Sequence, residues 1–279
     1  MTASICHPAS PTPWRTTAPM RFQCARSSRA TPGRWIARAL PVAATREDVD
    51  AACATLAALR DSPGDQAEVD AAVLALKELS KAAGTNRVHA ELAHGEFEGR
   101  AMRGRLRKLA EAADPGQLNL GVLGWRTMQP ADLPVRVSGG DVPQSLVARG
   151  PAFGLGDVYR LSTGFVTLGE GPQAGLRGIS HAIAEYRTSE DHTRILVDFK
   201  WVRLEPAPGQ DLAAWKAVVG PGNVEMDGAG VVLKHLPKAN SGWVDMVVQT
   251  PGWELVVGNA GGVTLLRRLG SLPAGVTHT

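Results

Sequence analysis

Hydrophobic and polar residues alternate along the C-terminal two-thirds of this chain of 279 residues. The clearest case is the segment 194–204, where Ile195, Val197, Phe199 and Trp201 occupy every second position and charged residues separate the last three. Successive side chains of a strand point to opposite faces of a sheet. This period of two therefore predicts a strand with one face in an apolar interior.

Similar short segments follow one another from residue 118 onward, separated by turns rich in glycine and proline. Strands at regular spacing, with no crossover helix between them, are typical of an antiparallel barrel or sandwich. We expect one short surface helix between these strands, over residues 211–218. The predicted strands cover residues 120–127, 144–149, 157–168, 178–188, 193–205, 230–236, 242–249, 253–257 and 262–268.

The segment before residue 118 has a helical period instead. Thr45 and Asp48 have the spacing of a capping box, in which two side chains satisfy the free amides at the start of a helix. Apolar residues then recur every three or four positions over residues 49–59. The same pattern predicts a second helix over residues 66–83 and a third helical stretch, interrupted by glycines, over residues 88–113.

The first 46 residues contain no aspartate or glutamate, but they hold seven arginines, ten serines or threonines and six prolines. This composition is typical of an organellar transit peptide, which is removed and takes no part in the fold. Because the prolines interrupt the amphipathic helix that a mitochondrial presequence needs, we expect a plastid address. A disordered basic tail that binds phosphate is the alternative.

These patterns predict four parts. They are a disordered transit peptide over residues 1–46, a helical region over 47–117, an antiparallel β-barrel over 118–270 and a flexible tail over 271–279.

The transit peptide also accounts for the net charge of +3 of the whole chain. Without it, 23 Lys and Arg face 27 Asp and Glu. A nucleic-acid-binding protein would keep a basic stripe after processing, so we expect no nucleic-acid partner. We interpret the basic run at residues 100–108 as a solvated or membrane-surface helix face.

Candidate catalytic and metal-binding residues do not form a recognisable motif. His89 and His94 are five residues apart, whereas a zinc-protease helix needs two histidines four apart so that both project from one face. Ser180 and His181 suggest part of a hydrolase triad, but the sequence has no Gly-x-Ser-x-Gly turn to present the serine. Cys53 lies on the apolar face of a predicted helix, where a buried thiol is the better interpretation than a nucleophile. We expect neither catalysis nor a cofactor.

Four tryptophans, Trp125, Trp201, Trp243 and Trp253, lie in predicted strands. Large aromatic side chains inside a barrel either fill a small core or line an apolar ligand cavity. An eight-stranded barrel has the size that holds one small ligand. Both interpretations stay open on the sequence alone.

The end of the chain resembles a known family. An apolar strand at residues 253–257 leads into the turn Gly258-Asn259-Ala260-Gly261 and then into Val263, Leu265 and Leu266. This order and spacing resembles the closing motif of the plastid lipid-associated protein (PAP/fibrillin) family. The resemblance is specific over the last thirty residues or so and weaker over about 150. Val257 stands where the family usually has an arginine.

The resemblance implies an α+β protein with N-terminal helices packed on a lipocalin-like antiparallel barrel. It also implies a plastid protein at plastoglobules or thylakoid membranes that binds or shields small hydrophobic molecules, such as prenylquinones, carotenoids or acyl lipids. The alternatives are a structural or scaffolding protein with a solid barrel core and an enzyme of plastid lipid or pigment metabolism.

On this interpretation we expect specific residues at the ligand and at the lipid surface. Asp245 is the expected polar contact near the cavity mouth. The helix face expected on anionic lipid headgroups carries Arg100, Arg103 and Arg107. The expected cavity wall consists of Trp125, Phe199, Trp201, Trp243 and Val256.

Overall fold

The computed structural model describes residues 44–61, 66–104, 118–137 and 146–271, all of which belong to the unit Leu40–Thr279. Nearly all of the predicted transit peptide and of the predicted C-terminal tail lies outside the described residues, as does Arg107.

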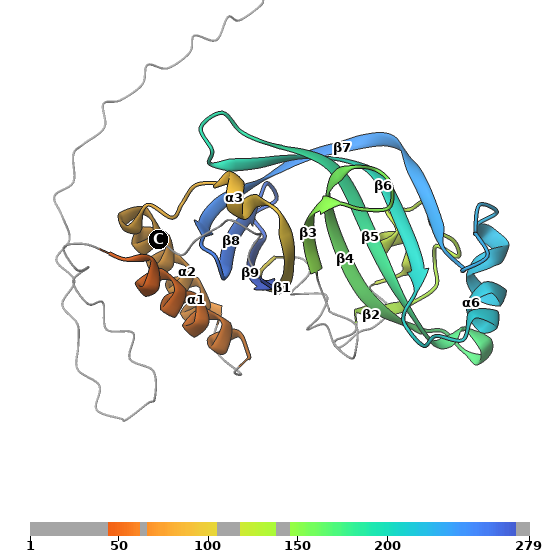
Figure 1. Cartoon of the computed structure of the whole chain (residues 1–279). Helices are drawn as coiled ribbons and strands as arrows, with labels where there is room; N and C mark the ends of the chain where they lie inside the picture. Colours follow the sequence, from red (N-terminus) through yellow and green to blue (C-terminus); the bar gives the residue numbers. More distant parts are fainter. Residues whose placement is uncertain (1–43, 62–65, 105–117, 138–145, 272–279) are drawn as a thin grey trace, which may run out of the picture. The chain divides into compact units, whose positions relative to one another are not determined.

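The described strands form one antiparallel sheet that closes on itself (Figure 1). The strands are β1 (Gly95–Arg103), β2 (Val135–Val137), β3 (Leu146–Pro151), β4 (Asp157–Leu168), β5 (Ala174–Thr188), β6 (Arg194–Pro206), β7 (Val232–Gln249), β8 (Trp253–Gly258) and β9 (Val263–Leu269). Eight of them follow one another in the order β4-β3-β1-β9-β8-β7-β6-β5, and β5 pairs back with β4. The short strand β2 is added to β4. The prediction of an α+β fold with an antiparallel barrel is therefore confirmed.

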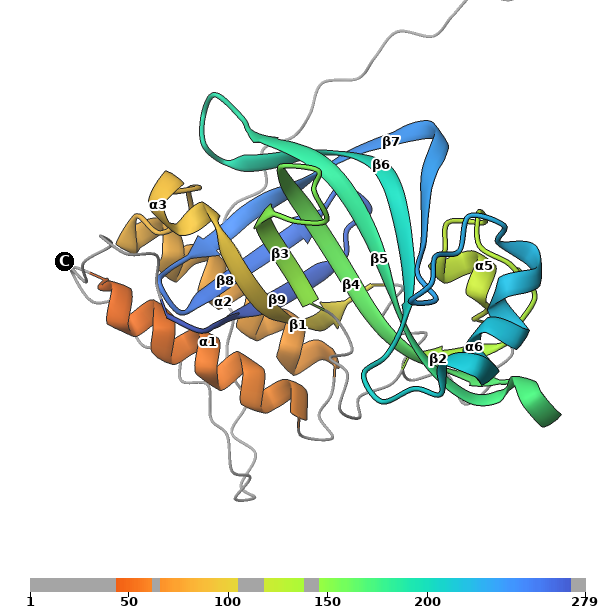
Figure 2. The ribbon, with the colours of Figure 1, turned by 45° about the vertical axis from the view of Figure 1, so that its right-hand side comes forward.

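Helices flank this barrel. They are α1 (Arg46–Asp61), α2 (Gln66–Ala83), α3 (Ala90–Ala93), α5 (Leu120–Leu123) and α6 (Leu212–Val219), with 3₁₀ helices at Gly171–Gln173 and Gly220–Gly222. Figures 1 and 2 show α1 and α2 beside β8, β9 and β1, whereas α6 lies near β2.

Every strand of the barrel contributes to an apolar interior cluster. Because alternate side chains of a strand face inward, a few positions per strand are enough to form it. Its buried members are Phe97 from β1, Val147 from β3, Tyr159 from β4, Ala184 from β5, Ile195 and Val197 from β6, Met246 from β7, Val256 from β8 and Leu266 from β9, joined by Val88.

A β-bulge exchanges the two faces of β6. The ladder with β5 gains one residue, Lys200, between Phe199 and Trp201. Because the side-chain period is two, one inserted residue moves all later side chains to the opposite face. Val202 and Leu204 are therefore the buried residues beyond the bulge. The prediction that Trp201 shares the interior face with Phe199 is wrong for this reason.

A second apolar cluster surrounds Trp215 of α6. The ring of Trp215 is fully buried, and its Nε1 donates a hydrogen bond of 2.8 Å to the carbonyl oxygen of Gly230. The ring centroid lies 6.4 Å from that of Phe165 on β4. Asp211 caps α6 by accepting hydrogen bonds from the amides of two residues in its first turn.

The N-terminal helices pack on the outer side of the barrel through a third cluster. Leu56 of α1 and Leu76 of α2 meet Leu255 of β8 and Leu265 of β9 there. The predicted capping box is present: the Thr45 amide donates to Asp48 Oδ2 at 3.0 Å, and the Asp48 amide donates to Thr45 Oγ1 at 3.2 Å. Among the described residues, no helix combines the length and the apolar character that crossing a bilayer requires.

Cys53 belongs to the same cluster and is completely buried. Burial raises the pKa of its thiol to about 12, and Asp50 adds to the shift. The side chain therefore stays a neutral thiol at physiological pH and acts as a small apolar residue.

Two predicted elements are wrong. The segment predicted as a third helix contains strand β1, because Phe97, Gly99 and Ala101 alternate with charged residues and two of these inward positions are too small to give a visible hydrophobic pattern. The expected helix bearing Arg100 and Arg103 does not exist in this region, since both residues lie on β1.

The segment predicted as the first strand, residues 120–127, forms α5 and a turn instead. Two of its non-glycine residues, Trp125 and Arg126, have left-handed backbone angles, with φ of 52° and 61°. A strand cannot contain such angles. The apolar residues of this segment are explained instead by their place in the cluster around Trp215.

Gly178 on β5 allows Trp215 and Phe165 to approach the strand. A Cβ atom at this position would lie 2.6 Å from atoms of both rings. We therefore predict that Gly178→Ala lowers the free energy of unfolding by about 1–3 kcal/mol. The measurement is urea unfolding followed by tryptophan fluorescence. The matched control is Gly252→Ala, where an added Cβ meets nothing within 4 Å. Equal stability of the two variants would contradict the packing described here.

Candidate functional site

A cavity of about 420 Å³ lies within the barrel wall. Its lining comes from β1, β3, β4, β6, β7, β8 and β9 and from the turn after α5, so residues far apart in the sequence meet there. Most of these side chains are apolar. The described lining residues are Ala101, Arg103, Trp125, Val147, Tyr159, Leu161, Val197, Phe199, Asn240, Ser241, Gly242, Trp243, Val244, Val256, Gly258, Asn259, Ala260, Gly262, Thr264 and Leu266.

Three aromatic rings form a continuous surface in this cavity. The ring centroids of Trp125 and Phe199 are 4.9 Å apart, and Tyr159 meets Phe199 edge-on at 6.2 Å. Burial raises the pKa of the Tyr159 hydroxyl to about 12, an effect that Arg149 opposes and Glu254 supports. The phenol is therefore neutral at physiological pH and offers an uncharged hydroxyl beside apolar walls.

The turn after α5 holds Trp125 in place. Asn119 caps α5 by accepting a hydrogen bond of 2.9 Å from the Val122 amide, and Gly124 donates back to the carbonyl of Leu120 at 2.7 Å. Gly124 has to be glycine, since a Cβ there would lie 2.4 Å from Met128. Positive φ angles at non-glycine residues are costly and persist only when the surroundings enforce them. The position of Trp125 is thus fixed by tertiary contacts.

A buried ion pair lies within the barrel next to the cavity lining. The side chains of Arg149 and Glu254 are 1 % and 0 % exposed, with Arg149 Nη2 at 2.5 Å from Glu254 Oε1. Gln249 Nε2 donates to the same oxygen at 2.9 Å, and Arg149 Nε donates to the carbonyl of Ala93. Burial opposes the charge of Arg149, but the adjacent Glu254 outweighs it, so the pKa of Arg149 is raised. Arg149 therefore stays ionised, and neither side chain lines the cavity.

The mouth of the cavity is polar, unlike its interior. Four exposed polar side chains gather there, namely Arg103, Asn240, Ser241 and Asn259. Trp243, also at the mouth, is 39 % exposed. Apolar walls with a few polar groups at the opening are typical of sites that bind small molecules.

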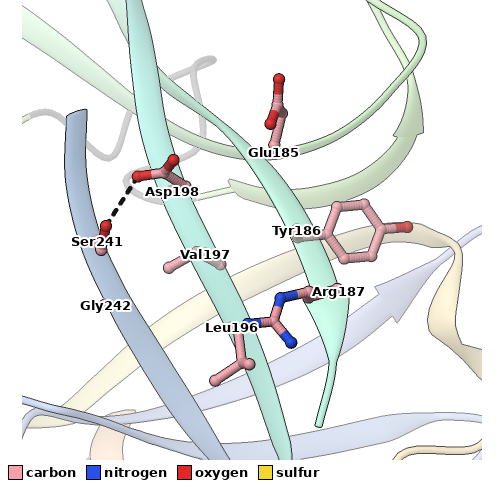
Figure 3. A pocket seen from close by; sticks show the side chains of 8 residues that line it. All are labelled: Glu185, Tyr186, Arg187, Leu196, Val197, Asp198, Ser241 and Gly242. Carbon is pink, nitrogen blue, oxygen red and sulfur yellow. Dashed lines mark hydrogen bonds between the residues drawn. The ribbon is translucent and has the colours of Figure 1, made fainter.

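A second hollow, of about 410 Å³, lies on β5, β6 and β7 (Figure 3). Glu185 and Asp198 stand at one end of this groove, and Arg187 and Leu196 at the other. Ser241 donates a hydrogen bond of 2.9 Å to Asp198 Oδ1. A larger share of the groove's lining than of the cavity's lining is therefore polar. It shares three lining residues with the cavity, which are Val197, Ser241 and Gly242.

The sequence located part of the cavity wall. Trp125, Phe199, Trp243 and Val256 line the cavity, while their contact with a ligand stays a prediction. Trp201 does not line it: the bulge at Lys200 turns the ring away, and it packs edge-on against His235 with centroids 5.8 Å apart.

Asp245 does not line the cavity either. It is paired across the β6–β7 ladder with Arg194, whose Nε lies 2.5 Å from Asp245 Oδ1. The expected polar contact at the mouth is therefore wrong for Asp245. Among the arginines expected at a lipid surface, Arg103 lies at the mouth and Arg100 elsewhere on β1.

Sequence reasoning missed other wall residues, notably Tyr159 and Leu161 on β4 and Leu266 on β9. All three lie in segments that were predicted as strands. The alternation over residues 157–168 would have placed Tyr159 and Leu161 on the same face as Phe165.

The sequence suggested Ser180 as the partner of His181, but in the structure His181 contacts another serine. Ser180 donates to the carbonyl of Leu123, whereas His181 Nδ1 lies 2.7 Å from Ser162 Oγ. On the other side of the ring, His181 Nε2 lies 3.1 Å from Glu205 Oε1. The pKa of Glu205 is lowered to about 2, first by the contact with His181 and further by Arg203, while burial acts in the opposite sense.

This Ser–His–Glu group is closed rather than poised for catalysis. Ser162 is buried on a strand that pairs with neighbours on both sides, so its backbone amide belongs to the ladder and not to an oxyanion hole. The Phe153 ring covers His181 with centroids 5.4 Å apart, and the guanidinium of Arg203 lies 4.3 Å from that ring. The group fixes three adjacent strands to one another.

No cluster of three or more His, Cys, Asp or Glu side chains suited to a metal ion occurs among the described residues. His89 and His94 flank the four-residue helix α3, which leaves them on extended backbone.

Comparison with known proteins adds no name to this geometry: no protein-family model, no curated protein and no solved structure matches the chain.

His181 makes the stability of the fold depend on pH. Burial lowers its pKa, Arg160 and Arg203 add to this effect, and Glu205 opposes it. Because the unfolded state then binds the proton more readily, stability is complete above the unfolded pKa of about 6.5 and falls as the pH drops through the lower folded value. We predict that the free energy of unfolding decreases below pH 6.5 by up to about 1.4 kcal/mol per pH unit.

Urea unfolding between pH 7.5 and 5.5 measures this slope. His181→Gln should remove most of it, and His192→Gln, at an exposed histidine, should leave it unchanged. An unchanged slope in His181→Gln would show that another group titrates.

Proposed function

We propose that this protein binds a small apolar molecule inside its barrel. The observation that supports this most is the cavity of about 420 Å³ with an aromatic and aliphatic wall. Ligand sites usually have volumes of about 300–1,000 Å³ and mostly apolar linings. Transfer of apolar ligand surface from water into this cavity would contribute about 25 cal/mol per Å² before the costs of ordering the ligand.

An eight-stranded closed antiparallel barrel with a ligand in its interior is the arrangement of lipocalins, so we propose a lipocalin-like barrel. The alternative of a scaffolding protein requires a solid core, and the cavity argues against it. The barrel fold is consistent with a non-enzymatic binding protein.

We further propose the ligand and setting that the family resemblance implies, which are a hydrophobic metabolite or lipid and the plastoglobule or thylakoid surface of a plastid. Three of the residues on which the resemblance rests, Gly258, Asn259 and Leu266, line the cavity, which supports this proposal. The exposed Trp243 and Arg103 at the mouth suit contact with a lipid surface.

The test of the binding function is a cavity-filling variant. Val256→Phe adds a ring to the cavity wall, and we predict at least a tenfold loss in affinity for an apolar fluorescent probe such as 1-N-phenylnaphthylamine. Val224→Phe is the matched control, because Val224 is 95 % exposed and lies outside the cavity.

Circular dichroism of both variants checks that they fold. Trp125→Ala is a second variant, which removes part of the aromatic surface without adding volume. It should also weaken the binding of the probe. Binding that is equal in wild type, Val256→Phe and Trp125→Ala would place the probe elsewhere and refute the proposal. Mass spectrometry of lipids that co-purify with the protein from its own organism then identifies the natural ligand.

A further inference from the structure

We infer that the cavity and the groove form one bipartite site for an amphipathic molecule. Its apolar part occupies the cavity, and its uncharged, polyhydroxylated headgroup, a sugar, lies in the groove. This inference rests on the proposed function, because the cavity has to hold the apolar part.

The two hollows adjoin at the same short stretch of β6 and β7. Val197, Ser241 and Gly242 line both of them. Val197 belongs to the interior cluster, whereas Leu196 and Asp198 alternate with it, so the groove lies on the outer face of the ladder whose inner face lines the cavity.

The ladder between β6 and β7 is interrupted next to this stretch. Phe199 pairs with Asn240, but Trp201 pairs with His235, so several residues of β7 leave the ladder between these two pairs. Residues 237–241 are all exposed. On its other side this stretch of β7 has no ladder partner among the described strands, because the ladder with β8 ends at Val244 and Gly258. We place the exit of the ligand along this edge of β7, where Ser241 lines both hollows.

The groove offers hydrogen-bond donors and acceptors side by side. Asp198 and Glu185 accept, the exposed Arg187 donates, and the Ser241 hydroxyl can do both. Glu185 already forms an ion pair of 2.6 Å with Lys200. Within the described part of the chain, Arg187 forms no ion pair and is available to a ligand.

These charges favour a neutral headgroup. Lys200 balances Glu185, which leaves one acidic and one basic side chain, Asp198 and Arg187, around the same hollow. A strongly anionic or cationic headgroup would meet a like charge at one of them. Hydroxyl groups, which donate and accept, satisfy both.

An apolar surface stands beside the polar residues. Leu196 and Trp243 pair across β6 and β7, and both are outside the interior cluster of the barrel. Such a surface suits the C–H face of a sugar ring, while the hydroxyls at its edge reach the charged side chains.

The experiment compares three probes with the same alkyl chain and different headgroups. These are 1-octanol, n-octyl-β-D-glucopyranoside and octyl sulfate, each titrated into the full chain below its micelle concentration by isothermal calorimetry. We expect the glucoside to bind at least about tenfold more tightly than either of the others, since one or two hydrogen bonds to charged groups account for such a factor.

Variants of the groove separate its contribution from that of the cavity. Arg187→Ala and Asp198→Ala should each lower the affinity for the glucoside about five- to tenfold and leave the affinity for 1-octanol unchanged. Arg136→Ala, at an exposed arginine on β2, is the matched control and should change neither.

The outcomes distinguish the two proposals. If 1-octanol binds but the glucoside is not preferred, or if octyl sulfate binds best, the bipartite sugar site is refuted and the binding cavity stands. If the groove variants lower the affinity for 1-octanol as much as the affinity for the glucoside, the groove has no separate role and the inference is again refuted. If no probe binds to wild type, both proposals fall.

Discussion

The barrel depends on the pairing of β4 with β5, which closes the sheet. This ladder runs from the pair Tyr159 and Ala184 to the pair Leu168 and Ala174. It gives each of the eight strands two hydrogen-bonded neighbours and leaves no free edge in the ring. Because the cavity wall takes side chains from seven of these strands, a sheet open at this point would enclose nothing. The side of the ladder away from the cavity carries Ser162 and His181, and Glu205 of β6 extends the same contact to a third strand.

Two ionic groups in this barrel have different physical roles. Arg149 and Glu254 lie inside, away from water, and compensate each other at the cost of removing two charges from solvent. Because neither lines the cavity, a ligand meets the neutral phenol of Tyr159 and the aliphatic wall rather than a bare charge. In the second group the His181 ring is buried and its pKa is lowered, so this group responds to acidity.

Much of the fold could be predicted from the sequence because its pattern is strong where the elements are long. The capping box at Thr45, the helix Gln66–Ala83 and the strand Asp157–Leu168 are found where the pattern placed them. Strand β1 was not predicted, because Gly99 and Ala101 occupy inward positions that give no hydrophobic signal.

The candidate site could be predicted only in part, because its wall depends on register between distant strands. Nothing local marks Lys200 as an inserted residue, and this insertion decides that Phe199 faces the cavity and Trp201 does not. Asp245 meets Arg194, a partner 51 positions away. Trp125 reaches the cavity from a left-handed turn that no propensity scale would assign to a tryptophan followed by an arginine.

The buried pair between β3 and β8 constrains how this chain can change over time. Loss of one partner leaves the other as an uncompensated ion in a dry interior. This typically costs about 3–5 kcal/mol, which is a large share of the stability of an ordinary domain. Replacement of both partners by apolar residues of similar volume has no such cost. Related sequences should therefore keep Arg149 and Glu254 together or lose them together, and intermediates that retain one should be rare.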